Sequence, residues 1–533
     1  MASRADKTAP SKTRRLEGNA AGDMTAGSRP ASSAAGGRAE RRTFRLSLAG
    51  LLTTLALASL DQNIVSTALP RIVSELGGLA HLPWVITAFM LTATATAPLY
   101  GKLSDMHGRR QLFVVAILVF TAGSALCGLA RSMTELILFR GLQGLGAGGL
   151  MVLAQTAIAD LVPPRQRGRY QGLFSGVFAL CSVTGPVLGG VITDALSWRW
   201  IFYVNLPVGM VALSLILVAL PRSKRPRVAH RIDYLGAVLL TTTTAALLLL
   251  LSSGGTVAAW SSPTIVGLAL GAAVLLMLLL ARERVAAEPI LPLPLLSNRV
   301  FAVAIAVVAV TATALFGAFI YLPTFFQLVQ GKSPSHAGLL TAPLMAGMIT
   351  ASVIGGRLVS ALGRYKGLSV LGLALSSAGL GAIAASARNA APLPVIEAAL
   401  VVTGAGLGLV MPNLTVAIQN AVPPEMLGVA TSAVSFFRSL GGAFGVALSG
   451  SLLTGRVDAA LAAAGSAAAA ARRAVSGGAG GIAALPPELH ALVAAAYRQA
   501  IATTFATSAV IAGFGLVLLL LLPERSLRDV PAG

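Results

Sequence analysis

The sequence predicts an all-α, polytopic membrane protein. Of its 533 residues, 55% are hydrophobic and only 11% are charged, a balance that soluble domains do not have. Apolar runs long enough to cross about 30 Å of hydrocarbon recur along the whole chain. Since the backbone finds no water inside a bilayer, continuous apolar runs of this length form helices. We expect about fourteen transmembrane helices, starting near Leu46, Trp84, Leu112, Thr134, Gln171, Ile201, Asp233, Pro263, Val300, His336, Gly367, Pro392, Leu427 and Ala500.

Basic residues are concentrated in the tails and in the short loops on one side of these helices. The positive-inside rule then places both termini in the cytoplasm of a multi-pass protein of the plasma (inner) membrane. Topology and attraction to lipid head groups account for the net charge of +21, so nucleic acid is not expected as a partner. Residues 1–45 are rich in Ala, Gly, Ser and Arg and are expected to be a disordered basic cytoplasmic tail, and residues 523–533 a second tail.

The chain contains an internal repeat. Residues 140–164 (RGLQGLGAGGLMVLAQTAIADLVPP) align without a gap with residues 400–424 (LVVTGAGLGLVMPNLTVAIQNAVPP). In the same way, GKLSDMHGR at 101–109 aligns with GRLVSALGR at 356–364. Two homologous halves of six helices each are typical of transporters built from parallel repeats.

The repeat sets the expected domains. An N-terminal six-helix bundle spans 46–220, and a C-terminal six-helix bundle spans 300–522, with an extracellular loop at 456–498. The linker 221–299 contains two inserted helices, which are expected to be peripheral. In this architecture the substrate path lies between the halves, near the midplane of the membrane.

Asp61 is a carboxylate inside an apolar helix, where it costs roughly 2.5–3.5 kcal/mol and needs a partner, a proton or a function. Arg140, in the fourth predicted helix, lies at a similar depth, so we expect the two to pair directly or through water. The pair is either a static salt bridge or a site where Asp61 gains a proton. Thr54 shares the face of Asp61 and suggests a polar track. At the positions that match Arg140 and Asp105 the second half is uncharged, so we expect it to be the plainer half.

The loop motif GKLSDMHGRR follows the second predicted helix. Its glycines allow a tight turn, and its basic residues mark the cytoplasmic face. Asp105 is expected to pair with these basic residues or to cap a helix end. Because a matching segment occurs in the second half, the motif is interpreted as a gating loop, with candidate residues Gly101, Asp105, Gly108, Arg109 and Arg110.

Two glycine motifs lie inside apolar helices. GLGAGG at 144–149 matches the dinucleotide fingerprint G-x-G-x-x-G, but it lacks the strand that the fingerprint requires, so we interpret it as helix packing. SVTGPVLGG contains Gly185, Pro186, Gly189 and Gly190 within the fifth predicted helix. It is either ordinary membrane packing or a bent interface with a helix of the other half.

Other polar residues give weaker indications. Glu397 lies near the outer end of the twelfth helix, where it either extends to the interface or contacts substrate. Cys127 and Cys181 fall inside predicted helices and are expected to be packing residues rather than a disulfide or metal ligands. We expect no catalytic residue, metal site or cofactor, since the five histidines are scattered over loops and helix ends, at positions 81, 107, 230, 336 and 490.

Taken together, these motifs resemble the major facilitator superfamily, and within it the drug:proton antiporters with fourteen helices. LDQNIVSTALP at 60–70 is similar to that family's motif in its first helix, with Asn63 in place of the usual Thr. GKLSDMHGRR, RGLQGLGAGG and GPVLGG are similar to its loop, fourth-helix and antiporter motifs, and WRWIFYVNLPVG at 198–209 is typical of it.

The resemblance implies a major facilitator fold and roles for particular residues. Asp61 would be the proton-linked acid, Arg140 the charge that responds to it, and the Gly/Pro face of the fifth helix the element that restrains leak. Asn63, Thr54 and Glu397 are candidates for the substrate path. No acid occurs between 337 and 359, which disfavours dications as substrates.

The sequence therefore predicts a proton-coupled efflux antiporter that exports lipophilic, cationic small molecules by alternating access. It would need the proton gradient, the bilayer and its substrate, but no cofactor, and a monomer would suffice. Export of one endogenous metabolite or of a basic amino acid is an alternative that no residue excludes. A membrane-embedded enzyme or a non-transporting scaffold is the alternative of another class; the enzyme would need a cluster of catalytic side chains that the sequence does not contain.

Overall fold

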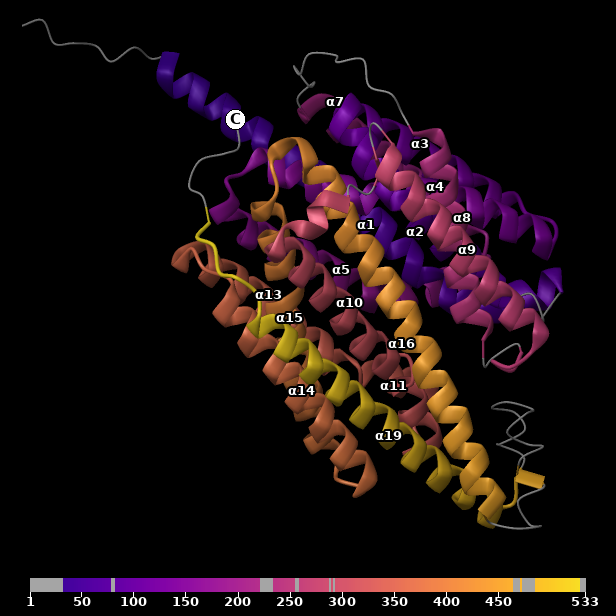
Figure 1. Cartoon of the computed structure of the whole chain (residues 1–533). Coiled ribbons are helices and arrows are strands. Elements are labelled where there is room, and N and C mark those ends of the chain that lie inside the picture. Colours follow the sequence, from indigo (N-terminus) through magenta and orange to yellow (C-terminus); the bar gives the residue numbers. More distant parts are fainter. Residues whose placement is uncertain are drawn as a thin grey trace, which may run out of the picture. The chain divides into compact units, whose positions relative to one another are not determined.

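The computed structural model describes residues 32–77, 82–220, 233–254, 258–286, 289–290, 293–463, 470–471 and 485–527. Residues 44–533 form one compact unit, and the description below concerns this unit. Helices stand at all fourteen predicted places, and the described residues contain no β-strand (Figure 1).

The helices of the first half and of the insert are α1 (Ser32–Leu76), α2 (Leu82–His107), α3 (Arg109–Leu129), α4 (Met133–Leu161), α5 (Pro164–Ala195), α6 (Trp200–Tyr203), α7 (Asn205–Ala219), α8 (Tyr234–Ser253) and α9 (Pro263–Val285). The second half contains η2 (Leu293–Ser297), α10 (Arg299–Phe319), α11 (Leu322–Thr324), η3 (Phe325–Val329), α12 (Pro334–Leu339), α13 (Ala342–Leu362), α14 (Lys366–Arg388), α15 (Leu393–Ala421), η4 (Pro424–Met426), α16 (Leu427–Ala463) and α19 (Pro487–Leu520).

Thirteen segments of the described chain are long and apolar enough to cross a membrane. The helix α2 is not among them, although its 26 residues would reach across the bilayer. Its threonines and its charged end lower its hydropathy. The membrane-spanning, all-helical fold is confirmed, and the count of fourteen spans stays a prediction.

Part of the amino-terminal tail is helical. Because α1 begins at Ser32, the disorder predicted for 1–45 is wrong from Ser32 onward. Four Arg and three Ala occur among residues 32–45, and both residue types have high helix propensity. Residues 1–31 lie outside the described residues.

The predicted loop 456–498 is shorter than expected. α16 continues to Ala463 and α19 begins at Pro487, so both ends of the predicted loop are helical. Alanine is frequent at both ends and extends the two helices. Outside the described part of the chain lie 464–469 and 472–484 of this loop, and 528–533 of the predicted C-terminal tail.

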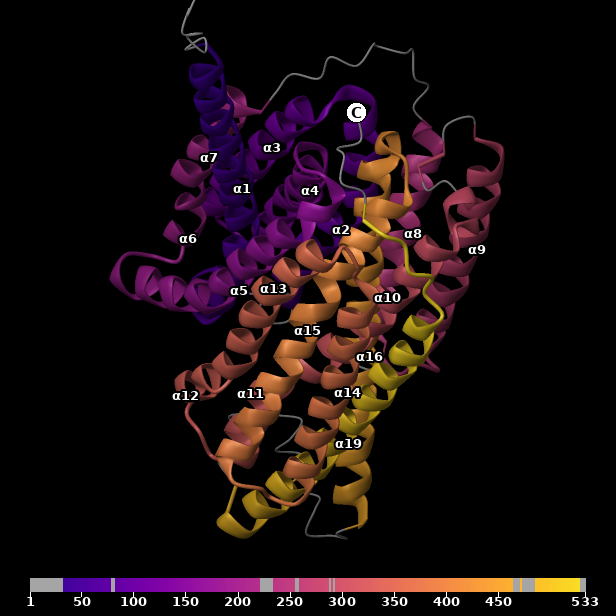
Figure 2. The same ribbon diagram turned by 90° about the vertical axis from the view of Figure 1, so that its left-hand side faces the viewer.

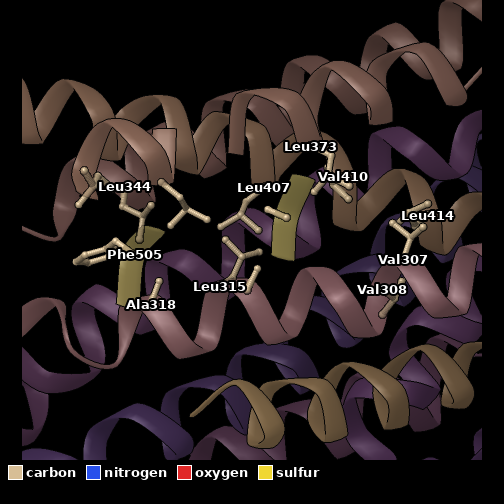
Figure 3. Close-up of a cluster of buried hydrophobic side chains, with 14 of the residues drawn as sticks. Val307, Val308, Leu315, Ala318, Leu344, Leu373, Leu407, Val410, Leu414 and Phe505 are labelled. Carbon is tan, nitrogen blue, oxygen red and sulfur yellow. The ribbon is translucent and has the colours of Figure 1, made fainter. Parts of the chain in front are cut away.

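Buried apolar side chains gather separately in the two halves. Apart from Ala159 and Leu527, the largest cluster contains only residues of the predicted second half, among them Leu315 on α10, Leu407 on α15 and Phe505 on α19 (Figure 3). Two further clusters fill the first half. The cores of the two halves are therefore largely separate, and the bounds of the two bundles stay a prediction.

The inserted helices stand beside both bundles. α8 and α9 pack against each other, and α8 also packs against α2 of the first half and α16 of the second (Figure 2). Leu240 of α8 shares a small apolar cluster with Phe436 of α16. The insert is thus attached at the boundary between the halves.

The glycine motif of the repeat makes the same contact in each half. A Cβ atom added to Gly144 on α4 would clash with the carbonyl oxygen of Phe89 on α2. A Cβ atom added to Gly404 on α15 would clash with the carbonyl oxygen of Leu344 on α13. Glycine lets each pair of helix backbones touch, so GLGAGG is a packing motif, as predicted.

Candidate functional site

A buried ion pair joins α1 and α4. Arg140 Nη1 lies 2.7 Å from Asp61 Oδ2, and the two side chains are 1% and 0% exposed. The direct pairing that the sequence predicts is present. Whether the pair carries a proton stays a prediction.

Three neutral side chains complete the surroundings of Asp61. Gln143 donates from Nε2 to Asp61 Oδ1 at 2.8 Å and accepts from Arg140 Nη1 at 2.8 Å. Asn205, the first residue of α7, donates from Nδ2 to Asp61 Oδ1 at 2.7 Å and to Ser124 Oγ at 3.0 Å. None of the three is a predicted site residue, because neutral polar residues are common in membrane helices, although Gln143 and Asn205 lie within the motifs RGLQGLGAGG and WRWIFYVNLPVG.

Arg140 is held from a second side by α2. Its Nε donates to the carbonyl oxygen of Val85 at 3.3 Å, and its guanidinium carbon lies 4.1 Å from the centroid of the Phe89 ring. An arginine over an aromatic face is attracted by the ring electrons. Arg140 therefore keeps partial stabilisation when the charge of Asp61 changes.

The reaction that this network can support is the binding and release of a proton at the carboxylate of Asp61. Arginine stays charged in proteins, so Asp61 is the member of the pair that can change its charge. Protonation of Asp61 would remove the attraction to Arg140 and turn one acceptor oxygen into a donor. In a buried site such a change leaves an unpaired cation, which costs several kcal/mol unless the helices rearrange.

The three predicted path residues are not gathered around Asp61. Thr54 is fully buried and donates to the carbonyl oxygen of Gly50 at 2.7 Å, within its own helix. Asn63 donates from Nδ2 to the carbonyl oxygen of Ser59 at 2.7 Å. Glu397 is half-buried on α15 and makes no ion pair with any described residue. Their role in a substrate path stays a prediction.

The face of α5 that contains Gly185 and Gly189 packs against α1 of the same half. A Cβ atom added to Gly185 would approach Asn63 Cβ to 2.8 Å, and one added to Gly189 would clash with the carbonyl oxygen of Ile64 on α1. The interpretation of this motif as an interface with the other half is therefore wrong in this structure. Glycines show that a helix face is flat, but not which neighbour it meets. Gly190 has open space around it.

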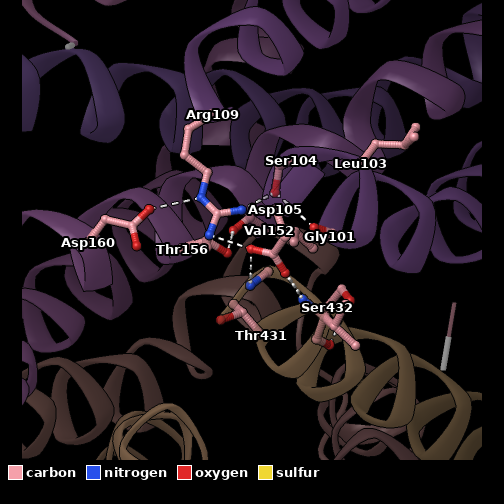
Figure 4. A network of polar contacts seen from close by, with 12 residues as sticks. Gly101, Leu103, Ser104, Asp105, Arg109, Val152, Thr156, Asp160, Thr431 and Ser432 are labelled. Atoms are coloured by element: carbon pink, nitrogen blue, oxygen red, sulfur yellow. Dashed lines mark hydrogen bonds and ion pairs between the residues drawn. The ribbon is translucent and has the colours of Figure 1, made fainter. Parts of the chain in front are cut away.

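Asp105, near the end of α2, contacts the start of α16. Its Oδ1 and Oδ2 accept hydrogen bonds from the backbone N–H groups of Gly428 and Val429, both at 3.0 Å (Figure 4). These groups lie in the first turn of α16, where no intrahelical acceptor exists and the helix dipole favours an anion. Arg109 forms an ion pair with Asp105 and another with Asp160. Asp105 thus does both things predicted for it, pairing with a basic residue and capping a helix.

A contact of opposite polarity lies at the matching position of the repeat. Arg165, in the first turn of α5, donates from Nε to the carbonyl oxygen of Ser360 at 3.0 Å and from Nη2 to that of Ala361 at 3.1 Å. These carbonyls belong to the last turn of α13, where the helix dipole favours a cation. Gly168 and Gly356 let the two backbones touch at this crossing.

The remaining residues of the gating loop also have defined places. Gly108, between α2 and α3, has φ 90°, a backbone conformation that favours glycine. Arg110 donates to the carbonyl oxygen of Leu217 on α7. A Cβ atom added to Gly101 would clash with the carbonyl oxygen of Gly428. Residues 101–107 of the motif belong to α2, and Arg109 and Arg110 belong to α3, so the prediction that the motif forms a loop is wrong except at Gly108. The motif stands where α2 meets the second half, and its role as a gate stays a prediction.

A charged residue of α16 was overlooked in the sequence. Arg438 stands within a predicted membrane span, and its Nη2 lies 3.0 Å from Met151 Sδ on α4. The expectation that the second half is the plainer one is therefore wrong. An arginine inside a 20-residue apolar run is a visible signal, but Arg438 aligns with the uncharged Phe178 in the repeat, so it does not stand out among the matched charged positions.

At the other end of the first half, α1 is tied to the segment before α6. Arg199 Nη2 lies 2.7 Å from Glu75 Oε1, and Trp198 Nε1 donates to Glu75 Oε2 at 2.7 Å. These hydrogen bonds from Arg199 and Trp198 lower the pKa of Glu75 below its ordinary value. Cys127 and Cys181 are buried free thiols, as the sequence predicts.

Comparison with known proteins extends these observations. The model of the family described as Major Facilitator Superfamily matches residues 51–446. An uncharacterized MFS-type transporter of Mycobacterium tuberculosis is 39% identical over 90% of this chain and 69% of its own length. The multidrug transporter protein MdtP of Bacillus subtilis is 38% identical over 79% of this chain and 77% of its own.

Solved structures agree on the fold. The human organic anion transporter MFSD10 superposes with a TM-score of 0.60 at 17% identity, covering 90% of this chain and 99% of that one. The proton:xylose symporter XylE superposes with a TM-score of 0.59 at 15% identity, covering 91% and 97%. At these identities the likeness concerns the fold alone. With its repeated six-helix bundles, its buried charge pair and these relatives, the chain belongs to the Major Facilitator Superfamily and is a membrane transporter rather than an enzyme.

Proposed function

We propose that this transporter is a proton-coupled efflux antiporter that exports lipophilic small molecules from the cytoplasm across the plasma membrane. The observation that carries the proposal is the fully buried pair of Asp61 and Arg140. Burial of a carboxylate in a membrane helix is expensive and marks functional sites, proton relays among them. A relative in Fusarium that is named an MFS-type efflux pump supports efflux as the direction, and relatives in Bacillus subtilis are named for multidrug transport and multidrug resistance.

In the proposed cycle, Asp61 alternates between two partners. When ionised, it is paired with Arg140 and accepts hydrogen bonds from Gln143 and Asn205, as in this structure. A proton that binds to a carboxylate oxygen of Asp61 removes its charge and releases Arg140. The released cation must find other partners, and this requirement couples the proton to a movement of α1 against α4.

The orientation follows from the basic loops. The positive-inside rule assigns the end with the Asp105 and Arg165 contacts to the cytoplasm, and both termini with it. Because these contacts join the halves at that end, the described state is closed toward the cytoplasm. Opening toward the cytoplasm then requires that both contacts break, which is alternating access around a site between the halves.

Lipophilic cations are included among the proposed substrates. Glu397 is a carboxylate without an ion-pair partner in the described chain, and Asp61 becomes available to a cation whenever Arg140 moves away. A cation at Asp61 would compete with its proton, which gives the exchange of substrate for proton a direct physical basis.

The test is collapse of an imposed proton gradient in inside-out vesicles on addition of a panel of lipophilic cationic dyes. We expect the native protein to dissipate the gradient and Asp61→Asn to lose this response while it still binds the dyes. A matched control is Asp194→Asn, which removes an exposed carboxylate in the last turn of α5 and should respond like the native protein. Equal responses of native protein and Asp61→Asn would refute Asp61 as the coupling acid.

The same assay separates coupling from damage. Asp61→Asn leaves Arg140 as an unpaired buried cation, so Asp61→Asn/Arg140→Gln is measured beside it. If the double variant binds the dyes but still fails to dissipate the gradient, loss of the carboxylate and not of the fold explains the result. Dye export by the native protein without any proton movement would refute the antiport.

A further inference from the structure

Arg438 is a cation near the middle of a membrane helix. It lies about 16 Å from the start of α16 at 1.5 Å per residue, which is about half of a 30 Å hydrocarbon core. The residue it contacts, Met151, lies about 15 Å from the end of α4 by the same measure. Arg438 therefore stands at the midplane, on the boundary between the two halves, and it is partly exposed there.

Three other arginines inside the described helices have oxygen partners. Arg140 is paired with Asp61, and Arg109 with Asp105 and Asp160. Arg167 donates to the carbonyl oxygens of Ala159 and Gln419. For Arg438 the one polar contact with the described residues is the thioether of Met151. A thioether is a weak acceptor, whereas a guanidinium has five N–H donors, so the described residues meet little of the hydrogen-bonding capacity of Arg438.

Further polar atoms without partners lie along the same boundary. Ser435 Oγ, one turn before Arg438 on α16, and Gln155 Oε1, one turn after Met151 on α4, are buried and have no hydrogen-bond partner among the described residues. Gln419 Nε2 lies 3.4 Å from the carbonyl oxygen of Gln155, which brings α15 to the same place. Buried polar atoms are nearly always satisfied, so these two atoms can take a hydrogen bond from a polar group or a water molecule that enters this boundary.

The two residues before Arg438 are aromatic. The ring centroids of Phe436 and Phe437 lie 5.3 Å apart, and Phe436 packs with Leu240 of α8 in a small apolar cluster. Small-molecule sites typically combine apolar side chains with a few convergent polar groups, and Arg438 and its neighbours supply both kinds of group.

We propose that Arg438 is a substrate-binding residue that takes a carboxylate or equivalent anionic group of the exported molecule. This inference rests on the proposed export function and names part of its substrate class: lipophilic compounds with an anionic group, including zwitterions. The planar guanidinium can hold a carboxylate with two parallel hydrogen bonds, and the Ser435 hydroxyl can donate a third. An ammonium or an uncharged amide at position 438 would not reproduce this geometry.

The test measures binding with matched dyes that differ in one group. Tetramethylrhodamine carries a free carboxylate, and its methyl ester does not; carboxylate and methyl-ester forms of other lipophilic dyes extend the panel. Fluorescence polarisation with the purified full chain in nanodiscs gives the Kd of each dye. We expect the native protein to bind the carboxylates about tenfold more tightly than the esters, which corresponds to about 1.4 kcal/mol.

Variants then assign the preference to Arg438. Arg438→Gln should bind carboxylate and ester equally, and Arg438→Lys should keep an intermediate preference. Arg388→Gln, which removes an exposed arginine at the end of α14, is the control and should keep the native preference. The melting temperature of each variant verifies the fold.

Several outcomes would overturn the inference. The inference fails if the native protein binds both members of every pair equally or binds none of them, and it also fails if Arg438→Gln keeps the preference for carboxylates. Each of these outcomes would assign Arg438 to a role within the protein, such as an ion pair with an aspartate or glutamate of the same chain. Since binding is measured without a proton gradient, failure of the proton coupling leaves this result unchanged, and the two proposals are tested separately.

Discussion

Replacement of Asp61 by Asn changes the charge of a buried pair with little change of shape. Arg140 then keeps Gln143 Oε1, the carbonyl oxygen of Val85 and the face of Phe89, but it loses its counter-ion. Removal of one partner of a buried pair costs about 3–5 kcal/mol. Because three stabilising contacts remain, we expect a loss near the lower end, about 3 kcal/mol in the free energy of unfolding.

A double-mutant cycle isolates the pair. Arg140→Gln should cost a similar amount, whereas Asp61→Asn/Arg140→Gln should cost less than the sum, with a coupling energy of about 2 kcal/mol. The free energy of unfolding is measured by SDS titration in mixed micelles, followed by tryptophan fluorescence. If the two single effects add to within about 0.5 kcal/mol, the ion pair is not energetically coupled and the argument for Asp61 and Arg140 fails.

Two further predictions concern packing and pH. Gly189→Val should destabilise the protein by about 1–3 kcal/mol in the same titration because the valine side chain would meet α1. The side chain of Gly190→Val, at the next position, would point into open space, so this substitution should be neutral. Equal effects of the two substitutions would contradict the α1–α5 contact. The pKa of Glu75 is lowered by Arg199 and Trp198, so the carboxylate stabilises the fold above its ordinary pKa of about 4.3, and this contribution is lost as pH falls further. The difference in melting temperature between native protein and Glu75→Gln should therefore stay constant from pH 8 to 6 and shrink near pH 4; a difference that grows on acidification would reverse the assignment.

The sequence predicts those features that depend on composition and local chemistry. A charge inside an apolar run must be neutralised, so two opposite charges at similar depth in the membrane are predicted to pair. Asp61 and Arg140 do pair. Repeated glycines mark close helix contacts, and Gly144 and Gly404 make equivalent ones. These predictions need no knowledge of how distant helices are arranged.

Features that depend on the arrangement of helices are not predictable in this way. The partner of the Gly189 face is α1 and not a helix of the other half, because a flat face fits several neighbours equally well. Asn205 reaches Asp61 only because α7 begins beside α1 and α3. Arg438 was visible as a charge in the sequence, but its lack of an oxygen partner appears only when α16 is placed against α4.

The two contacts that hold the halves together at one end have opposite polarity. Asp105 is an anion on a helix start, and Arg165 is a cation on a helix end. A proton can neutralise the aspartate but not the arginine, so acid weakens one crossing and leaves the other intact. The contact between α2 and α16 would then break first, and the crossing of α5 and α13 would break after it. The two copies of the repeat thus place one titratable contact and one permanently charged contact at the same end of the molecule.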